Sequence, residues 1–423
     1  MLVRIVYTLL LALASPLLLF GLYKSKPNKP KFGSRWKEHF GITPELKSND
    51  KPIWIHAVSV GESIAATPLI KALKEQNPEQ SILVTTTTST GAEQVAKLGD
   101  LIEHRYMPID FGFAIKGFLK AVQPKQMLII ETELWPNTLH NVHKAGIPIT
   151  VVNARLSEKS CKNYAKIQRL FNQLHPCLTQ VLCQTASDAE RFERLGVEKK
   201  KLSVTGSIKF DIQISEQVKQ QGQQLRAQLG DDRPIWIAAS THKGEDEQVL
   251  DAHRQVLKSH PNALLVLVPR HPERFDDVFT LCQQQGFNTV RRTSTHAVTH
   301  AVETNTQVYL GDTMGEMLTL MGAADICFMG GSLIGDKVGG HNVLEPAMLE
   351  KVIITGPSYF NFKEIVSDLL DIDGILLASD TTDLAKHLTS LLSKPSLSEL
   401  YEIKACHYAK RNQGALKRTT DKL

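Results

Sequence analysis

A short pattern that occurs twice constrains the fold of this chain more than any other feature. The first copy, Lys51-Pro52-Ile53-Trp54-Ile55, and the second, Arg233-Pro234-Ile235-Trp236-Ile237, are each followed by small residues and then by a Gly-Glu pair. The apolar run of each copy predicts a buried strand, and the residues after each Gly-Glu pair predict a helix. At 423 residues the chain is also longer than one hydrophobic core can serve. We therefore expect two similar α/β domains that face each other across a cleft.

Further buried strands are predicted in both halves of the chain, with helical patterns between them. In the first half the strands cover residues 52–58, 81–86, 126–130 and 148–152, and in the second half 264–268, 324–329 and 352–357. A helix is predicted at 64–73 and a polar, Gln-rich helix at 215–229. Strands that alternate with helices indicate a parallel, doubly wound sheet in each domain. Ligands of such sheets bind beyond the carboxyl ends of the strands, so polar residues at these positions are candidates for the site.

Carboxylates follow two strands of the first domain. Glu62 comes three residues after Ser59, which is the spacing of a capping box, and a place near a helix amino terminus would keep it ionised. An ionised carboxylate at a strand end is also what a general base requires, and on the residues alone both interpretations stay open. Glu131 and Glu133 are costly at a core edge unless they bind something, so a functional role is favoured for them. Two further polar residues, Asn153 and Arg155, follow the next strand.

A glycine-rich segment, residues 330–347, joins an apolar strand to a helix in the second domain. Its five glycines allow positive φ angles and a close approach of the backbone to a ligand. Such a turn presents N–H groups and the positive end of a helix dipole, which suits an anion such as phosphate. Asn342 and Glu345 also have the spacing of a capping box, but capping alone does not require five glycines, so ligand binding is favoured. Arg270, which follows the strand at 264–268, is a second anion-binding candidate because its guanidinium keeps its charge and forks onto phosphate or carboxylate.

An almost uninterrupted apolar run covers residues 5–23, long enough to cross or nearly cross a bilayer. Arg4 is the single basic residue before the run, and many follow it: Lys24, Lys26, Lys29, Lys31, Arg35 and Lys37. The positive-inside rule therefore places the large carboxyl-terminal part in the cytoplasm. A cleaved signal peptide is the alternative, because Ala12-Leu13-Ala14 resembles a cleavage site, but Pro16 is badly placed for cleavage and apolar residues continue past it. We expect an uncleaved anchor, followed by an extended Pro- and Lys-rich linker at 25–31 that could rest on anionic lipid.

The composition argues against several classes of site. The net charge of +5 is mild and its charges are interspersed, so we expect no nucleic-acid surface. The six cysteines form no CxxC pair, which predicts reduced, buried thiols and neither a zinc site nor a disulfide framework. No Asp-x-Asp pair follows a strand in the way that a metal-bound nucleotide would need, so we expect no metal and no cofactor.

Six stretches, taken together and in order, resemble the 3-deoxy-D-manno-octulosonic acid (Kdo) transferase family over essentially the whole chain. They are His56-Ala57-Val58-Ser59-Val60-Gly61-Glu62, Glu131-Thr132-Glu133-Leu134-Trp135-Pro136-Asn137, Gly206-Ser207-Ile208-Lys209-Phe210-Asp211, Pro269-Arg270-His271, Asp312-Thr313-Met314-Gly315-Glu316 and the glycine-rich segment. The resemblance implies a GT-B fold, with two Rossmann-like domains that bind the acceptor and the nucleotide sugar respectively. It also implies transfer of Kdo from CMP-Kdo to lipid A precursor (lipid IVA). The implied reaction is inverting and metal-independent, on the cytoplasmic face of the bacterial inner membrane.

The resemblance further implies roles for single residues. Glu62 matches the family's general base, while Glu131 and Lys209 match residues that support the transition state. Three turns match the CMP-binding residues: Pro269-Arg270, Gly315-Glu316-Met317 and Asn342-Val343-Leu344-Glu345. Met317 stands where the family pattern would have leucine, which is a conservative departure. A cation such as Lys209 also suits the carboxylate of the donor sugar.

The expected division of the chain has four parts: a transmembrane anchor at 1–23, an acceptor-binding domain at 24–207, a CMP-sugar-binding domain at 208–400, and a tail at 401–423 that packs back toward the first domain. Three alternatives remain. A GT-B transferase for another nucleotide sugar would share these features. A serine hydrolase would use Ser59, because Ala57-Val58-Ser59-Val60-Gly61 approximates a nucleophile elbow, although its first glycine is missing and few strands precede it. A non-catalytic, membrane-tethered binding protein would keep its function without the Glu62 carboxylate.

Overall fold

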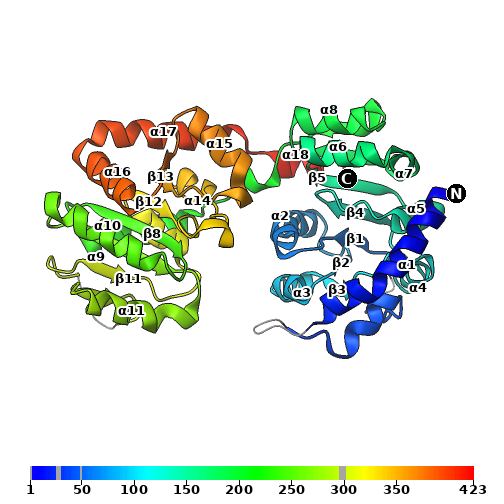
Figure 1. Cartoon of the computed structure of the whole chain (residues 1–423), viewed down its shortest axis with the longest axis horizontal. Helices are drawn as coiled ribbons and strands as arrows, with labels where there is room; N and C mark the ends of the chain where they lie inside the picture. Colours follow the sequence, from blue (N-terminus) through cyan, green and yellow to red (C-terminus); the bar gives the residue numbers. More distant parts are fainter. Residues whose placement is uncertain (1, 25–29, 48–49, 295–301) are drawn as a thin grey trace. The chain divides into compact units, whose positions relative to one another are not determined.

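The computed structural model describes residues 2–24, 30–47, 50–294 and 302–423, which form two compact units (Figure 1). The first unit comprises Met1–Asp211 together with Gln413–Leu423, and the second comprises Ile212–Asn412. The structure thus divides the chain after Asp211 rather than after residue 207, because the Asp211 carboxylate accepts hydrogen bonds from the backbone N–H groups of Gly414 and Leu416. Residues 401–412 belong to the second unit, mostly in α17 (Pro395–Arg411), and only 413–423 return to the first. Part of the predicted linker, residues 25–29, lies outside the described residues.

The first unit is built on a seven-stranded parallel sheet with the order β3-β2-β1-β4-β5-β6-β7. Its strands are β1 (Ile53–His56), β2 (Ile82–Thr86), β3 (Glu103–Tyr106), β4 (Gln126–Ile130), β5 (Ile149–Ala154), β6 (Gln180–Cys183) and β7 (Leu202–Val204). The four predicted strands correspond to β1, β2, β4 and β5. In β1, Trp54 packs in one hydrophobic cluster, and Ile53 and Ile55 pack in another. Successive side chains point to opposite faces of a strand, so this sheet is buried on both faces.

Helices complete the first unit. They are α1 (Leu2–Tyr23), α2 (Val60–Gln76), α3 (Ser89–Ala96), α4 (Gly112–Val122), α5 (Pro136–Lys144), α6 (Glu158–Lys166), α7 (Gln168–Leu174), α8 (Ala186–Arg194) and α18 (Ala415–Thr420), with short 3-10 turns such as η1 (Gly33–Phe40) and η5 (Ile208–Phe210). Of the helices described, α1 alone is long and apolar enough to cross a membrane, by length and composition, and it fits the expected anchor.

The second unit has its own seven-stranded parallel sheet, with the order β10-β11-β9-β8-β12-β13-β14. Its strands are β8 (Ile235–Thr241), β9 (Leu264–Pro269), β10 (Thr289–Arg291), β11 (Val308–Leu310), β12 (Ile326–Met329), β13 (Val352–Thr355) and β14 (Leu376–Leu377). Its helices, besides α17, are α9 (Glu216–Leu229), α10 (Asp246–Ser259), α11 (Phe275–Gln284), α13 (Met317–Ala323), α14 (Leu344–Met348), α15 (Lys363–Asp371) and α16 (Thr381–Ser393). The strands predicted in this half correspond to β8, β9, β12 and β13.

Each copy of the repeated sequence pattern forms the first strand, in sequence, of its sheet. Trp54 lies in β1 and Trp236 in β8, and both side chains are fully buried. Their ring N–H groups donate inside the core, to Thr85 Oγ1 (2.8 Å) and to His253 Nδ1 (3.1 Å) respectively. Strand order reverses at β1 and at β8, and in open α/β sheets ligands bind at the carboxyl end of such a switch point. The expectation of two similar α/β domains is confirmed.

Candidate active site

Glu62 lies in the first turn of α2, directly beyond the carboxyl end of β1. Ser59 is the N-cap, and the Glu62 N–H donates to its Oγ (3.3 Å). The Glu62 carboxylate accepts from Val58 N–H (2.8 Å) and from the Ser59 hydroxyl (2.9 Å). Burial nevertheless outweighs these bonds and raises the pKa of Glu62 from its usual value near 4.5 to about 7. Burial of the Glu62 side chain therefore opposes the ionised state that the helix amino terminus was expected to favour.

Two more carboxylates lie near Glu62. After burial, the charges of Glu133 and Glu131 also contribute to its raised pKa. Glu131 follows β4 with φ at +63°, a left-handed conformation that is uncommon outside glycine and that redirects the chain where the strand ends. Glu133 accepts from the Trp135 indole N–H at 3.1 Å. The structure thus brings the acidic strand ends of β1 and β4 together, as the topology predicts.

Asn153 connects the end of β5 to the turn that carries Lys209. Its φ is +54° and its side chain is fully buried. Asn153 Oδ1 accepts from the backbone N–H of Ile208 (3.1 Å), which is the first residue of η5. Lys209 follows directly, so a buried hydrogen bond fixes the start of the turn on which this candidate cation lies.

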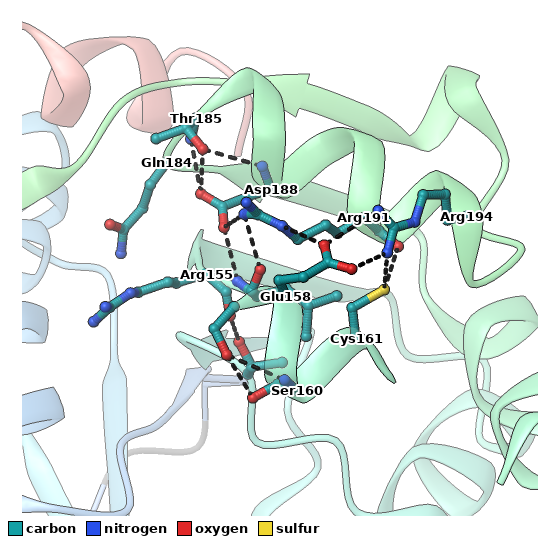
Figure 2. Close-up of polar contacts among 12 residues, drawn as sticks. Arg155, Glu158, Ser160, Cys161, Gln184, Thr185, Asp188, Arg191 and Arg194 are labelled. Carbon is teal, nitrogen blue, oxygen red and sulfur yellow. Dashed lines mark hydrogen bonds and ion pairs between the residues drawn. The ribbon is translucent and has the colours of Figure 1, made fainter. Parts of the chain in front are cut away.

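Residues 153–156 are held by side chains from three neighbouring segments, and Figure 2 shows part of this region. Thr132 Oγ1 donates to the carbonyl of Arg155, and Asp188 Oδ1 accepts from the N–H of Leu156 (2.9 Å). Gln184 Nε2 donates to the carbonyl of Asn153 (2.9 Å). Figure 2 shows the Arg155 side chain extending away from the ion pairs that Glu158 forms with Arg191 and Arg194. The role of Asp188 could not be predicted from the sequence, because this residue lies in α8, more than thirty residues from the strand end that it holds.

The glycine-rich segment of the second unit binds a carboxylate of the chain itself. Fully buried Glu245 accepts from the N–H groups of Gly331 (2.7 Å), Ser332 (3.0 Å) and Leu333 (3.0 Å), and from His242 N–H (3.2 Å). The segment was expected to offer its N–H groups to an anion such as phosphate, but those of Gly331, Ser332 and Leu333 are already occupied. Glu245 already takes the place of an anion there, and burial raises its pKa against the effect of these bonds.

Cationic and imidazole groups lie at the carboxyl ends of β8 and β9. His242 Nε2 and His341 Nε2 are 2.9 Å apart with their rings stacked, and His271 meets the His242 ring edge-on. Burial, followed by the neighbouring histidine and arginine charges, lowers the pKa of His242 and of His341 to about 4. Both rings are therefore neutral near pH 7, which leaves exposed Arg270 as the fixed cation beside them. Within the described residues Arg270 forms no ion pair, so it is available to an anion.

The remaining residues matched to CMP binding have partners in the second unit. The Glu316 carboxylate pairs with Arg292 (2.9 Å), and this bond lowers its pKa. Asn342 accepts from Leu344 N–H (3.1 Å) and donates to Glu345 (3.2 Å), while Val343 is the N-cap of α14. The predicted capping box of Asn342 and Glu345 is therefore wrong in its geometry, because the helix starts one residue later. Pro269 ends β9, Gly315 has φ at +86°, and Met317 begins α13.

The described residues contain no group of three His, Cys, Asp or Glu side chains placed to hold a metal ion. All six cysteines are free and buried.

Comparisons with known proteins identify the family of this chain. A family model described as 3-deoxy-D-manno-octulosonic-acid transferase matches residues 34–212, and one described as glycosyl transferases group 1 matches residues 232–410. A 3-deoxy-D-manno-octulosonic acid transferase of Haemophilus influenzae is 41% identical over 99% of this chain and 98% of its own. The chain belongs to the Kdo transferase family. A relative of the same description from Bordetella pertussis is 33% identical over 88% of this chain and 86% of its own.

Membership of the Kdo transferase family makes this chain a glycosyltransferase. A UDP-GlcNAc 2-epimerase of Neisseria meningitidis has a TM-score of 0.55 at 16% identity, over 88% of this chain and 99% of that one, which shows the GT-B fold alone. The serine hydrolase alternative is not supported by the site. Ser59 has an ordinary extended backbone and donates its hydroxyl to a carboxylate, and the nearby His56 is bonded to Thr85 (3.0 Å) instead.

Proposed function

We propose that this Kdo transferase moves Kdo from CMP-Kdo to lipid A precursor (lipid IVA), with inversion at the anomeric carbon and with Glu62 as general base. The observation that supports this most is the Glu62 carboxylate at the switch point of the first sheet. A pKa of about 7 makes it both a fair proton acceptor and substantially ionised at neutral pH. The proposed site is cytoplasmic, at the bacterial inner membrane, where a lipid acceptor would be presented.

In the proposed reaction, Glu62 takes the proton from a hydroxyl of the acceptor sugar. That oxygen forms a bond to the anomeric carbon of Kdo as the bond from this carbon to the phosphate oxygen of CMP breaks. CMP leaves with the bonding electron pair, and its developing charge is stabilised by Arg270 in the second unit. Glu131 and Lys209 support the transition state, the latter as a partner for the Kdo carboxylate.

The nucleotide is proposed to bind along the second unit at Pro269-Arg270, Gly315-Glu316-Met317 and Asn342-Val343-Leu344-Glu345. The partly buried, hydrogen-bonded Glu345 carboxylate suits the ribose hydroxyls of CMP as an acceptor. Arg270 supplies the cationic charge at the phosphate, so the proposed reaction requires no metal ion.

The test measures the transfer of Kdo from CMP-Kdo to lipid IVA by the purified full-length protein. The reaction is run in EDTA, with UDP-GlcNAc added as a competing donor. We expect a Kdo-bearing product whose anomeric configuration, read by NMR, is opposite to that of the donor. Product only from another nucleotide sugar would favour a different GT-B transferase. Product only after addition of a divalent cation would contradict the metal-free mechanism.

A further inference from the structure

Helix α1 is bonded to the first unit at both of its ends. Near its start, Tyr7 Oη donates to Asp110 Oδ2 (2.9 Å) and Thr8 Oγ1 accepts from Asn137 Nδ2 (2.9 Å). At its end the Tyr23 hydroxyl lies 2.7 Å from His39 Nδ1. Tyr7 and Tyr23 are about 24 Å apart along the helix, at a rise of about 1.5 Å per residue. Attachments so far apart hold the helix lengthwise against the unit.

The partner of Tyr7 belongs to a buried network. Asp110 is only 4% exposed and also accepts from the N–H groups of Asn137 (2.9 Å) and Thr138 (2.6 Å) and from the Thr138 hydroxyl (2.7 Å). It therefore holds the start of α5, and Asn137 donates back to the Asp110 carbonyl (2.7 Å). Removal of α1 would uncover this carboxylate and take away one of its donors, which is costly for a buried charged group. The docking of α1 is thus part of the first unit's own hydrogen bonding.

The two faces of α1 differ along its whole length. Partly buried residues recur at spacings of three and four, as at Arg4, Tyr7, Leu11, Ser15 and Leu19, which marks one face. This face contacts α5 and α7, and Figure 1 shows α1 beside α5. Six apolar side chains elsewhere on the helix are more than 60% exposed: Leu2, Leu9, Leu10, Leu13, Leu17 and Phe20. On α4, three residues after Asp110, Phe113 is also 63% exposed.

The position of Arg4 agrees with the attachment at the start of α1. Burial, and next to it the charge of Arg4, lower the pKa of His140 in α5. Arg4 therefore lies near the same unit that Tyr23 contacts at the other end of α1.

We infer that α1 lies in the plane of the membrane surface, with one face docked on the first unit and its apolar face inserted in one leaflet of a phospholipid bilayer. A helix that crosses the hydrocarbon core, about 30 Å thick, can touch a domain on one side of the membrane only near one end. Here the two ends touch the same unit. The exposed apolar face and the lysines that follow it, beginning with Lys24, suit an interfacial helix on anionic lipid.

The docking has a consequence for the acceptor. Helix α5 follows directly on the segment that contains Glu131 and Glu133, so Asp110 and Asn137 join that segment to the anchor helix. An in-plane α1 would then hold the acceptor-binding residues at a constant angle to the lipid surface. This consequence rests on the proposed function, whereas the docking itself does not.

The first test is an intramolecular cross-link in native membranes. Full-length Thr8→Cys/Asn137→Cys protein is oxidised in inner-membrane vesicles, and the peptides are mapped by mass spectrometry. We expect most of the protein to carry the 8–137 disulfide. The control pair is Ser157→Cys/Ser160→Cys, whose native hydroxyls are 3.0 Å apart within the first unit. A control pair that cross-links while 8–137 does not would overturn the inference.

The second test needs no buried substitution and reports on the side of the membrane. Leu2→Cys places a thiol at a position where the native side chain is 74% exposed. The native cysteines are buried, so labelling should report on the introduced cysteine. Spheroplasts are treated with a membrane-impermeant maleimide, with Lys24→Cys as the control for the cytoplasmic side. We expect both variants to be labelled only after the membrane is opened. Labelling of Leu2→Cys in intact spheroplasts would show a helix that spans the bilayer and would contradict the inference. Neither test depends on sugar transfer, so failure of the proposed function would be seen separately.

Discussion

Two glutamates occupy equivalent places in the repeated pattern but have opposite surroundings. Glu62 accepts one backbone N–H and one hydroxyl, whereas Glu245 accepts four backbone N–H groups. Glu245 is fully buried and bonded to the loop that follows β12, so its carboxylate is a structural anion. Burial of Glu62 outweighs the hydrogen bonds that its carboxylate accepts and raises its pKa to about 7, and burial also raises the pKa of Glu245.

The pKa of Glu62 predicts the pH dependence of the reaction. The carboxylate must be ionised to accept a proton, so kcat/KM should rise about tenfold per pH unit below pH 7 and level off above it. The Glu62 carboxyl group binds a proton more tightly in the folded state than in the unfolded state. Its contribution to the free energy of unfolding should therefore fall as the pH rises from about 4.5 to 7. A pH–rate profile of the wild type checks the first effect. A flat profile between pH 5.5 and 8 would contradict it.

Substitution of Glu245 should destabilise the second unit. Glu245→Gln places amide hydrogens against loop N–H donors, and each buried donor left without an acceptor costs about 1–3 kcal/mol. We expect the free energy of unfolding to fall by about 3 kcal/mol in urea titrations. Glu247→Gln is the matched control, because Glu247 is exposed in the first turn of α10, which begins directly after Glu245. This substitution should change the free energy of unfolding by less than about 0.5 kcal/mol. Equal stability of the two variants would show that the loop does not depend on Glu245.

At the scale of elements, the loop between β12 and α14 is shaped by its glycines. Gly331 and Gly335 have φ at +69° and +65°, a left-handed region that other residues adopt at a cost. Their surroundings differ. A Cβ on Gly331 would lie 2.8 Å from Val338 Cγ1 and 3.1 Å from His341 Cδ2, whereas a Cβ on Gly335 would meet nothing within 4 Å. The pair therefore separates backbone strain from crowding of the His341 ring.

Gly331→Ala and Gly335→Ala should both lose stability, and only the first should also lose affinity for the donor. The left-handed conformation costs either alanine roughly 1–2 kcal/mol. Gly331→Ala should in addition displace His341 from its stack on His242 and raise KM for CMP-Kdo about tenfold, which corresponds to about 1.4 kcal/mol. Steady-state kinetics and thermal melts of the two variants check this. A tenfold rise of KM in Gly335→Ala as well would assign the effect to strain alone.

Strands with long apolar runs could be predicted from the sequence, and short or polar edge strands could not. Val352–Thr355 is apolar and fully buried, whereas Glu103–Tyr106 has the composition of a surface segment and is a strand because it pairs with β2. The clustering of polar residues that follow the strands could also be predicted, because parallel strands align their carboxyl ends at one edge of the sheet. The partner of the glycine loop could not, because Glu245 and Gly331 are far apart in the sequence and meet only in the folded sheet. Helix starts such as that of α14 at Leu344 depend on local backbone angles that residue types alone do not specify.

At the scale of the whole molecule, the chain leaves the first unit after Asp211 and returns to it at Gln413. The returning helix α18 packs on α2, and Leu416 and Leu423 lie against the hydrophobic cluster on one face of the first sheet. Arg418 Nε donates to the carbonyl of Thr205 (2.8 Å). Thus the carboxyl-terminal residues complete the unit that contains Glu62.

Deletion of residues 413–423 should therefore destabilise the first unit. The loss of α18 uncovers apolar surface beside α2 and removes two N–H donors from Asp211, for which we expect a cost of at least about 3 kcal/mol. For a unit of this size the melting temperature should fall by about 6–12 °C, measured by calorimetry. The control is Lys417→Ala, at an exposed position on α18. Its melting temperature should stay within about 1 °C of the wild-type value. An unchanged melting temperature of the truncated chain would show that the tail is not part of the unit.

The central claim, that Glu62 is the general base, is tested most directly by comparing Kdo transfer in EDTA between Glu62→Gln and Ser59→Ala. Ser59→Ala loses the 2.9 Å bond from the serine hydroxyl to Glu62 but keeps the carboxylate, whereas Glu62→Gln loses the carboxylate. We expect kcat to fall by at least about two orders of magnitude in Glu62→Gln and by less than about tenfold in Ser59→Ala. Wild-type activity in Glu62→Gln, or a complete loss in Ser59→Ala alone, would contradict the account.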